Sequence, residues 1–337
     1  MLKILIALLF SVTVNSWSVC PVGSTVMAVP SVYATNTLAV AAIPVTPTNG
    51  YCVEVSGSAT YSEYPNWTGF TTSAVNYLYW TTAASAYHGG VFGVGPKLLT
   101  GVPAAQYHDF GSAYMTVDGL EFEGAAVIPL YATKLNFTFK NNLVTATSAT
   151  NGQTLQMWGG ANSNNNLVFN NVFRRTVITS SVNDNAIQFN SGTTAGSKVY
   201  NNTTINYDVP YRTASASVDF VNNIAVQGNG QSNTPFTGGT VMNYNACNRT
   251  CVGANSLATQ TFAWVDSAGG NFHLSNATYN ALGVAVTGYT TDIDGNTVGS
   301  PPQISHDFFF QDDTAAGSSS GCGGRLWRMG LAPRCSR

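Results

Sequence analysis

The chain has 337 residues, of which 44% are hydrophobic and only 8% are charged, and its formal net charge is −2. About a quarter of the residues of a typical soluble domain are charged, so the polar surface of this protein must consist of Asn, Thr, Ser, Gln and Gly. A nucleic-acid-binding protein needs a basic face, and the composition therefore argues against nucleic acid as a partner. The length suits one elongated domain or two ordinary ones.

Residues 1–18 have the pattern of a secretory signal peptide. Lys3 supplies the positive start, an apolar stretch runs up to Phe10, and small residues suited to cleavage follow. The apolar stretch is shorter than the ~20 residues that cross a bilayer as a helix, so we expect export and no membrane span after cleavage. Residues 19–50, rich in Val, Ala and Pro, are expected to cap the N-terminal end of the domain that follows.

Six cysteines fit an exported protein, because disulfides persist in oxidising compartments. Cys247 and Cys251 have the spacing of half a metal site, but no second Cys or His pair stands near them, which favours a small disulfide loop or free thiols. The simplest connectivity is sequential: Cys20–Cys52, Cys247–Cys251 and Cys322–Cys335.

Residues 51–123 are expected to begin a series of short strands. Residues 51–55 and 77–80 are rich in the aromatic and β-branched side chains that strands prefer. Asp118-Gly119 has the composition of a sharp bend. Glu121 and Glu123, two residues apart on a strand, are expected to share its outer, solvated face.

One sequence motif, an Asn-Asn pair with a strand-like segment on each side, occurs four times between residues 139 and 224. Asn and Gly tolerate the left-handed backbone region that a sharp bend requires. A strand–bend–strand unit that recurs every ~20–50 residues indicates a solenoid with one coil per repeat. The second residues of the bends, counting the variant Asp-Gly copy, are Gly119, Asn142, Asn171, Asn202 and Asn223.

Residues 155–160 and 187–192 form a second family of similar strands, so each coil is expected to contain three strands. Coils of this kind stack about 4.8 Å apart, which allows equivalent Asn side chains to hydrogen-bond along the stack as a ladder. The residues expected to point into the core are Leu143, Val168, Val172, Val199 and Ile224.

With these bends and coils, residues 50–310 resemble the right-handed parallel β-helix proteins of the pectate-lyase-like superfamily, of the exported bacterial or phage type. The resemblance implies an all-β fold, with a β-helix domain over residues 51–313 behind the N-terminal cap. The fold hosts lyases, hydrolases, phage tailspikes and non-enzymatic surface proteins, so it does not decide the activity. A Gly-His-Gly element is catalytic in polygalacturonases, whereas His88 stands in Tyr87-His88-Gly89-Gly90, for which we expect a turn.

The longer repeats carry loops in which the scarce charges gather, and insertions in solenoids often collect on a binding face. Arg pairs with carboxylates and Tyr stacks on sugar rings. The alternative is that these charges pair with one another and do no chemistry. The candidate catalytic residues are Asp184, Asp208 and Arg212, with Asp219 as a further carboxylate, and the candidate substrate-binding residues are Arg174, Arg175, Tyr207 and Tyr211.

The C-terminal part is expected to close the solenoid. Phe272-His273-Leu274-Ser275 resembles the last coil of exported bacterial β-helix proteins. Asp292, Asp294 and Asn296 have the spacing of a calcium loop, but Gln303 stands where that loop needs a bidentate Glu. We therefore expect a terminal turn, with no metal and no other cofactor, and Ca²⁺ only as a weak alternative. Residues 314–337, Gly/Ser-rich and then basic, are expected to be a flexible tail.

We therefore expect a secreted β-helix protein that binds extracellular carbohydrate or forms part of a surface or virion appendage. A polysaccharide lyase or glycoside hydrolase acting beside the long loops is the alternative. A hydrolase needs two carboxylates about 5–9.5 Å apart across a sugar. The positions of Asp184, Asp208 and Asp219 therefore discriminate between the two functions.

Overall fold

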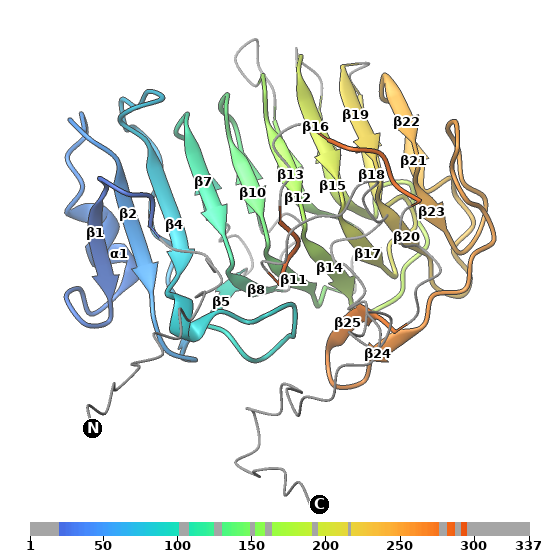
Figure 1. The fold of residues 1–337 in the computed structure, drawn as a ribbon, viewed down its shortest axis with the longest axis horizontal. Coiled ribbons are helices and arrows are strands. Elements are labelled where there is room, and N and C mark those ends of the chain that lie inside the picture. The colour runs from blue at the N-terminus through green and yellow to red at the C-terminus, as the bar shows by residue number, and fades with distance from the viewer. Residues whose placement is uncertain are drawn as a thin grey trace, which may run out of the picture.

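The computed structural model describes residues 20–100, 108–124, 130–148, 152–158, 164–190, 195–214, 217–275, 282–286 and 291–294. Within them the chain forms a parallel β-solenoid of about 8 turns (Figure 1), which confirms the predicted fold class. The predicted signal peptide, the C-terminal tail, Cys322 and Cys335 lie outside the described residues. No helix of the described part is long and apolar enough to cross a membrane.

Three parallel sheets form the walls of the solenoid, and a complete coil adds one strand to each wall, whereas the coils at the ends lack strands in the second or third sheet. The first sheet has nine strands: β1 (Thr25–Val29), β2 (Tyr51–Val55), β4 (Leu78–Thr82), β7 (Met115–Asp118), β10 (Thr138–Lys140), β13 (Leu167–Phe169), β16 (Ser197–Tyr200), β19 (Val218–Val221) and β22 (Val241–Asn243). The second sheet has eight: β3 (Thr60–Tyr61), β5 (Lys97–Thr100), β8 (Glu121–Gly124), β11 (Leu143–Ala146), β14 (Val172–Arg175), β17 (Thr203–Ile205), β20 (Ile224–Val226) and β23 (Ala246–Cys247). The third has six: β6 (His108–Phe110), β9 (Leu130–Ala132), β12 (Gln153–Met157), β15 (Asn185–Phe189), β18 (Tyr211–Thr213) and β21 (Phe236–Thr237).

The Asn-Asn bends join the first sheet to the second, and their second residues form a buried ladder. Nδ2 of each ladder Asn donates to Oδ1 of the next one at 2.9–3.2 Å. The same Oδ1 atoms also accept the backbone N–H of the preceding ladder residue. Every ladder amide is thus satisfied on both sides, as buried polar groups must be. The members are Asn142, Asn171, Asn202, Asn223 and Asn245, the last of which the sequence prediction did not include.

The variant bend Asp118-Gly119 is aligned with the Asn-Asn bends one residue differently from the prediction, which grouped Gly119 with the second residue of each bend. Asp118 pairs with Lys140 across the strands, so Gly119 corresponds to the first Asn of the next bend, Asn141, and not to Asn142. Both residues have positive φ, 72° and 53°. The left-handed position is therefore the first residue of each pair, because that is where the chain turns from one sheet into the next.

The core runs along the solenoid axis and is lined by aromatic rings. Trp80, Phe122, Phe139 and Phe173 follow one another with ring centroids 5.8–6.1 Å apart. Each such side chain contributes about 1.5–3 kcal/mol by burial.

Two of the five predicted inward residues, Val168 and Val199, lie in this core, and the prediction was wrong for the other three. Leu143 and Val172 pair in register with Glu121 on the outer face of the second sheet, and Ile224 follows on the same face. Strand residues alternate in direction, and the residue directly after each ladder Asn points outward.

The N-terminal end is covered by β1 and by the helix α1 (Asn36–Ala41), while a 3₁₀ turn, η1 (Ala84–Ala86), follows β4. Asn36 Oδ1 accepts the indole N–H of the buried Trp80 at 3.0 Å, which fixes the helix over the core. The Cys20–Cys52 disulfide ties the start of the described chain to β2. This disulfide is the Cys20–Cys52 pairing that the sequence predicted.

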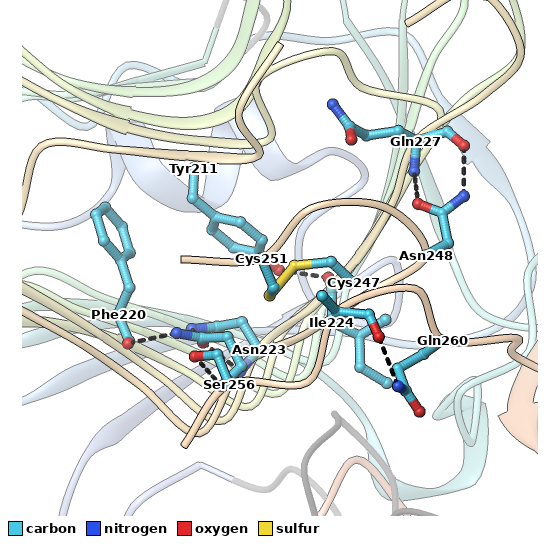
Figure 2. The surroundings of a disulfide bond; sticks show 12 residues. Tyr211, Phe220, Asn223, Ile224, Gln227, Cys247, Asn248, Cys251, Ser256 and Gln260 are labelled. Carbon is cyan, nitrogen blue, oxygen red and sulfur yellow. Dashed lines mark hydrogen bonds between the residues drawn. A yellow bond between two sulfur atoms is a disulfide. The ribbon is translucent and has the colours of Figure 1, made fainter. Parts of the chain in front are cut away.

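The C-terminal end of the core is closed by the second predicted disulfide, Cys247–Cys251 (Figure 2). Cys247 is fully buried, in the same core cluster as Tyr211 and Phe220. Beside the disulfide, Gln227 and Asn248 exchange two backbone–side-chain hydrogen bonds of 2.8–2.9 Å. The disulfide therefore covers the apolar interior at this end together with residues 254–257, which pair in parallel with residues 243–246.

Residues 264–275, 282–286 and 291–294 form what we call the C-terminal strap. It does not make a last coil, contrary to the prediction. Its antiparallel hairpin, β24 (Trp264–Asp266) and β25 (Asn271–Leu274), packs on the outer face of the second sheet. There Phe272 joins Phe92, Leu143, Val172 and Ile205 in a second apolar cluster. Residues 282–286 cross the first sheet near β16 and β19 (Figure 1).

Candidate functional site

The long loops stack at the corner between the second and third sheets, and their carboxylates are buried. Arg175 forms an ion pair with Asp184, and both side chains are almost fully enclosed. Asp184 also accepts hydrogen bonds from Thr179 Oγ1 at 2.8 Å and from the backbone N–H of Asp208 at 3.3 Å. Burial raises the pKa of Asp184, and the Arg175 guanidinium opposes that rise. This pair braces neighbouring coils from inside the corner.

Asp208 is fully buried beside this pair and is surrounded by donors. Its Oδ1 accepts the backbone N–H groups of Ser232 and Asn233 at 3.0 and 3.1 Å. Its Oδ2 accepts Asn233 Nδ2 at 2.6 Å and Ser180 Oγ at 3.2 Å. A carboxylate that holds four donors of its own chain is a structural anchor for the next loop. The catalytic role of Asp184 and Asp208 stays a prediction, and the geometry gives both a structural one.

The two predicted sugar-stacking tyrosines lie inside the protein. Tyr207 is fully buried, with its hydroxyl 2.8 Å from Thr154 Oγ1. Tyr211 stacks on Phe236 in the core at 4.6 Å, and its hydroxyl donates to the carbonyls of Asn202 and Ile224. Burial raises the pKa of both hydroxyls. Neither ring presents a face to a ligand.

Arg174 and Arg175 are separated, because neighbouring strand residues point to opposite sides. Arg174 lies under the strap on the outer face of the second sheet, with its guanidinium 3.8 Å above the Phe92 ring. Its Nε donates to Thr145 Oγ1 at 2.8 Å, and burial lowers its pKa. Glu121 on the same face is also fully buried, so the prediction of a solvated Glu121–Glu123 face was wrong for Glu121.

Like Arg174 and the further carboxylate Asp219, Arg212 stays partly exposed. Its Nη1 donates to Val182 O and Asn183 Oδ1, both at 2.9 Å. It points outward from the third sheet, whereas Asp219 stands on the outer face of the first sheet. The structure thus unites Arg175, Asp184 and Asp208 in one buried network, and leaves Arg212 and Asp219 on two other faces.

The outer face of the third sheet carries a continuous polar strip that the sequence prediction missed. Six side chains in register, one from each strand, follow the solenoid axis. We call this strip the axial row: Asp109, Tyr131, Gln156, Gln188, Arg212 and Thr237. The repeated Gln156 and Gln188, each between two apolar residues, were the available signal.

Trp158 stands next to the axial row, two residues beyond Gln156 and on the same face. Its indole is 48% exposed, which is unusual for so large an apolar side chain. Its backbone N–H donates to Ala132 O, and that of Asn190 donates to Met157 O, so the coils stay in register up to this point. The backbone that carries the ring is therefore part of the hydrogen-bonded wall of the solenoid.

Two oxygens of the axial row accept no hydrogen bond from the described residues. They are Asp109 Oδ1 and Gln188 Oε1, while Gln188 Nε2 donates to Asn190 Oδ1 at 2.6 Å. A buried acceptor without a donor costs about 1–3 kcal/mol. Burial also raises the pKa of Asp109, and Lys134 opposes this. Gln156 and Gln188 themselves are buried, at 4% and 7% exposure. The accessible groups of the strip are those of the partly exposed Asp109, Tyr131 and Arg212 and the exposed Thr237, beside the Trp158 indole.

No group of three or more metal-ligating side chains occurs in the described part of the chain. Asp292 Oδ1 accepts the backbone N–H of Asp294 at 2.9 Å, and Asp294 pairs with His273 at 2.9 Å. Asn296, the third residue of the considered calcium loop, lies outside the described residues. His88 is buried in its turn, where burial lowers its pKa to about 4.

Searches of protein-family models, of curated proteins and of solved structures find no match to this chain. The assignment of a function therefore rests on the geometry described above.

Proposed function

We propose that this protein is exported and binds an extracellular glycan along the axial row and Trp158. The observation that carries this proposal is the half-exposed Trp158 beside a row whose end members, Asp109, Tyr131, Arg212 and Thr237, are accessible. Sugar rings stack their apolar faces on aromatic rings, and their hydroxyls pair with amides, carboxylates and guanidinium groups. The coils follow one another at about 4.8 Å, and an extended polymer can reach the accessible members at the two ends of the row, Asp109 and Tyr131 at one end and Arg212 and Thr237 at the other.

Three further features support the proposal. The two disulfides fit an oxidising compartment outside the cytosol. The pattern of bends and coils supports membership of the pectate-lyase-like superfamily, with a right-handed winding. Among the described residues of the axial row, Asp109 is the single carboxylate, whereas glycoside hydrolysis uses two. This favours binding over the alternative of a lyase or hydrolase.

The test is a glycan array followed by affinity measurement with the glycans that are retained. Trp158→Ala should weaken binding about tenfold or more, as expected for loss of a stacking ring. Val241→Ala, at a 40% exposed position on the first sheet, is the matched control and should leave binding unchanged. Retention of no glycan, or equal affinity of Trp158→Ala and the intact protein, would exclude this site and favour a role as a surface or virion appendage.

A further inference from the structure

A pocket of about 180 Å³ lies between the C-terminal strap and the outer face of the first sheet. Its floor is formed by β16 and β19, and its roof by residues 284–286. It is a different place from the axial row, which belongs to the third sheet. We propose that this pocket binds a small zwitterion with an aliphatic side chain, of the class of free amino acids.

The roof of the pocket is fixed in place by the bend asparagines. Val284 donates its backbone N–H to Asn222 Oδ1 at 3.0 Å and accepts from Asn222 Nδ2 at 2.7 Å. Asn170 Nδ2 holds the strap again at Thr291 O, at 2.7 Å. Asn222 thus mimics a strand partner for Val284, and the roof stands at a fixed height above β16 and β19.

The floor places opposite charges side by side. Lys198 and Asp219 are partners across adjacent parallel strands, and both are partly exposed. Side chains in such positions normally attract one another, yet no ion pair within 4.0 Å joins these two described residues. An ammonium and a carboxylate therefore line the same pocket, each available to a ligand group of opposite charge.

The remaining walls are apolar. Val221 and Tyr200 complete the floor, and Val284, Ala285 and Val286 complete the roof. Tyr200 stacks on Phe169 at 4.8 Å with nearly parallel rings, so its position is fixed. A ligand with an aliphatic side chain would bury that chain against these walls.

The size and charge of the pocket define the ligand class. Pockets for drug-sized ligands have volumes of about 300–1,000 Å³, so this one accepts a smaller molecule. A carboxylate can pair with Lys198 while an ammonium group on the neighbouring carbon pairs with Asp219. Leucine, valine and isoleucine carry both charges and the aliphatic group.

Isothermal titration of the full chain with the free amino acids tests the proposal. Leucine or a related aliphatic amino acid should bind. Lys198→Met and Asp219→Asn should each weaken binding about tenfold or more, the order expected for a charge-assisted hydrogen bond. Lys134→Met, at an exposed lysine outside the pocket, should leave the affinity unchanged.

Blocked ligands separate the two contacts. N-acetyl-leucine lacks the ammonium group and should bind Asp219→Asn as well as it binds the intact protein. Leucine amide lacks the carboxylate and should be equally insensitive to Lys198→Met. Melting temperatures close to that of the intact protein show that the variants fold. No binding of any amino acid at millimolar concentration, or unchanged affinity in both variants, would overturn the proposal. Either result would leave glycan binding at the axial row unaffected.

Discussion

At the scale of single residues, the side-chain amides of the ladder asparagines hydrogen-bond the bends of successive coils to one another. A ladder Asn such as Asn171 donates to the backbone of its own bend at Phe169 O, to the backbone of the preceding coil at Phe139 O and to the amide of the next coil at Asn202 Oδ1. The first Asn of each pair does a different task, since it adopts the left-handed conformation. The two asparagines of one bend should therefore differ sharply in their effect on stability.

We expect Asn171→Ala to destabilise the protein by about 3 kcal/mol or more. The change leaves the Asn142 backbone N–H without its acceptor and removes the buried bonds from Asn171 Nδ2 to Phe139 O, Phe169 O and Asn202 Oδ1. Each unsatisfied buried group costs about 1–3 kcal/mol. The matched control is Asn141→Gly, which keeps the positive φ that Gly119 already shows at this position, and should cost about 1 kcal/mol. Urea unfolding of both variants measures the difference, and equal midpoints would refute a special role for the ladder.

Two buried histidines make stability depend on pH. Burial lowers the pKa of His88 from 6.5 to about 4 and that of His108 to about 3. Between these values and 6.5 the unfolded chain binds protons that the folded protein does not, so stability falls as the pH falls. Each histidine should cost about 2 kcal/mol between pH 7 and pH 5.

The variant His108→Phe tests this prediction. His108 lies among the rings of Trp80, Phe110 and Phe122, at centroid distances of 5.4–6.3 Å, so a Phe ring fits the surroundings. The loss of stability from pH 7 to pH 5 should shrink by about 2 kcal/mol, while the carboxyl groups contribute equally in both proteins. A variant with the same pH dependence as the intact chain would contradict the prediction.

At the scale of elements, the local chemistry of the bends decided what could be predicted. The Asn-Asn pairs specified the coils and the ladder, because Asn and Gly adopt that backbone conformation most readily. The fifth bend escaped prediction because Tyr244 takes the left-handed position before Asn245. Contacts between distant segments left no such signal. Leu143 and Val172 look like core residues in the sequence, but they are covered by Phe272, more than 90 positions further along. Similarly, Asp208 is buried because the backbone of Ser232 and Asn233 encloses it.

The strap hairpin should be a separately melting element. Phe272→Ala removes the ring that packs against Phe92 and covers the outer face of the second sheet. We expect a loss of about 3 kcal/mol in the local stability of the strap. Hydrogen exchange should then accelerate in residues 264–275, while the ladder amides stay protected. Val265→Ala, at an exposed position of the same hairpin, is the control. Equal acceleration in the ladder would show that strap and solenoid unfold together.

At the scale of the whole molecule, each coil contacts mainly its neighbours, so the solenoid is nearly one-dimensional. Its ends are its weakest points, since an end coil lacks one neighbour. The two disulfides sit at these ends: Cys20–Cys52 ties the segment before β1 to β2, and Cys247–Cys251 lies at β23. Their placement suggests that they prevent fraying, while the central coils are held by the ladder and the aromatic core.

Removing either disulfide should therefore loosen the end where it lies. In the Cys20→Ser, Cys52→Ser double variant, the chain-entropy relation predicts a loss of about 3–4 kcal/mol for a loop of this length. Hydrogen exchange should accelerate in β1 and α1, whereas the amides of β13 and β16 should keep their protection. The matched variant, Cys247→Ala with Cys251→Ala, should instead loosen β22 and β23, with a smaller loss because its loop is short. Loss of protection along the whole solenoid in either variant would show that the coils unfold as one cooperative unit.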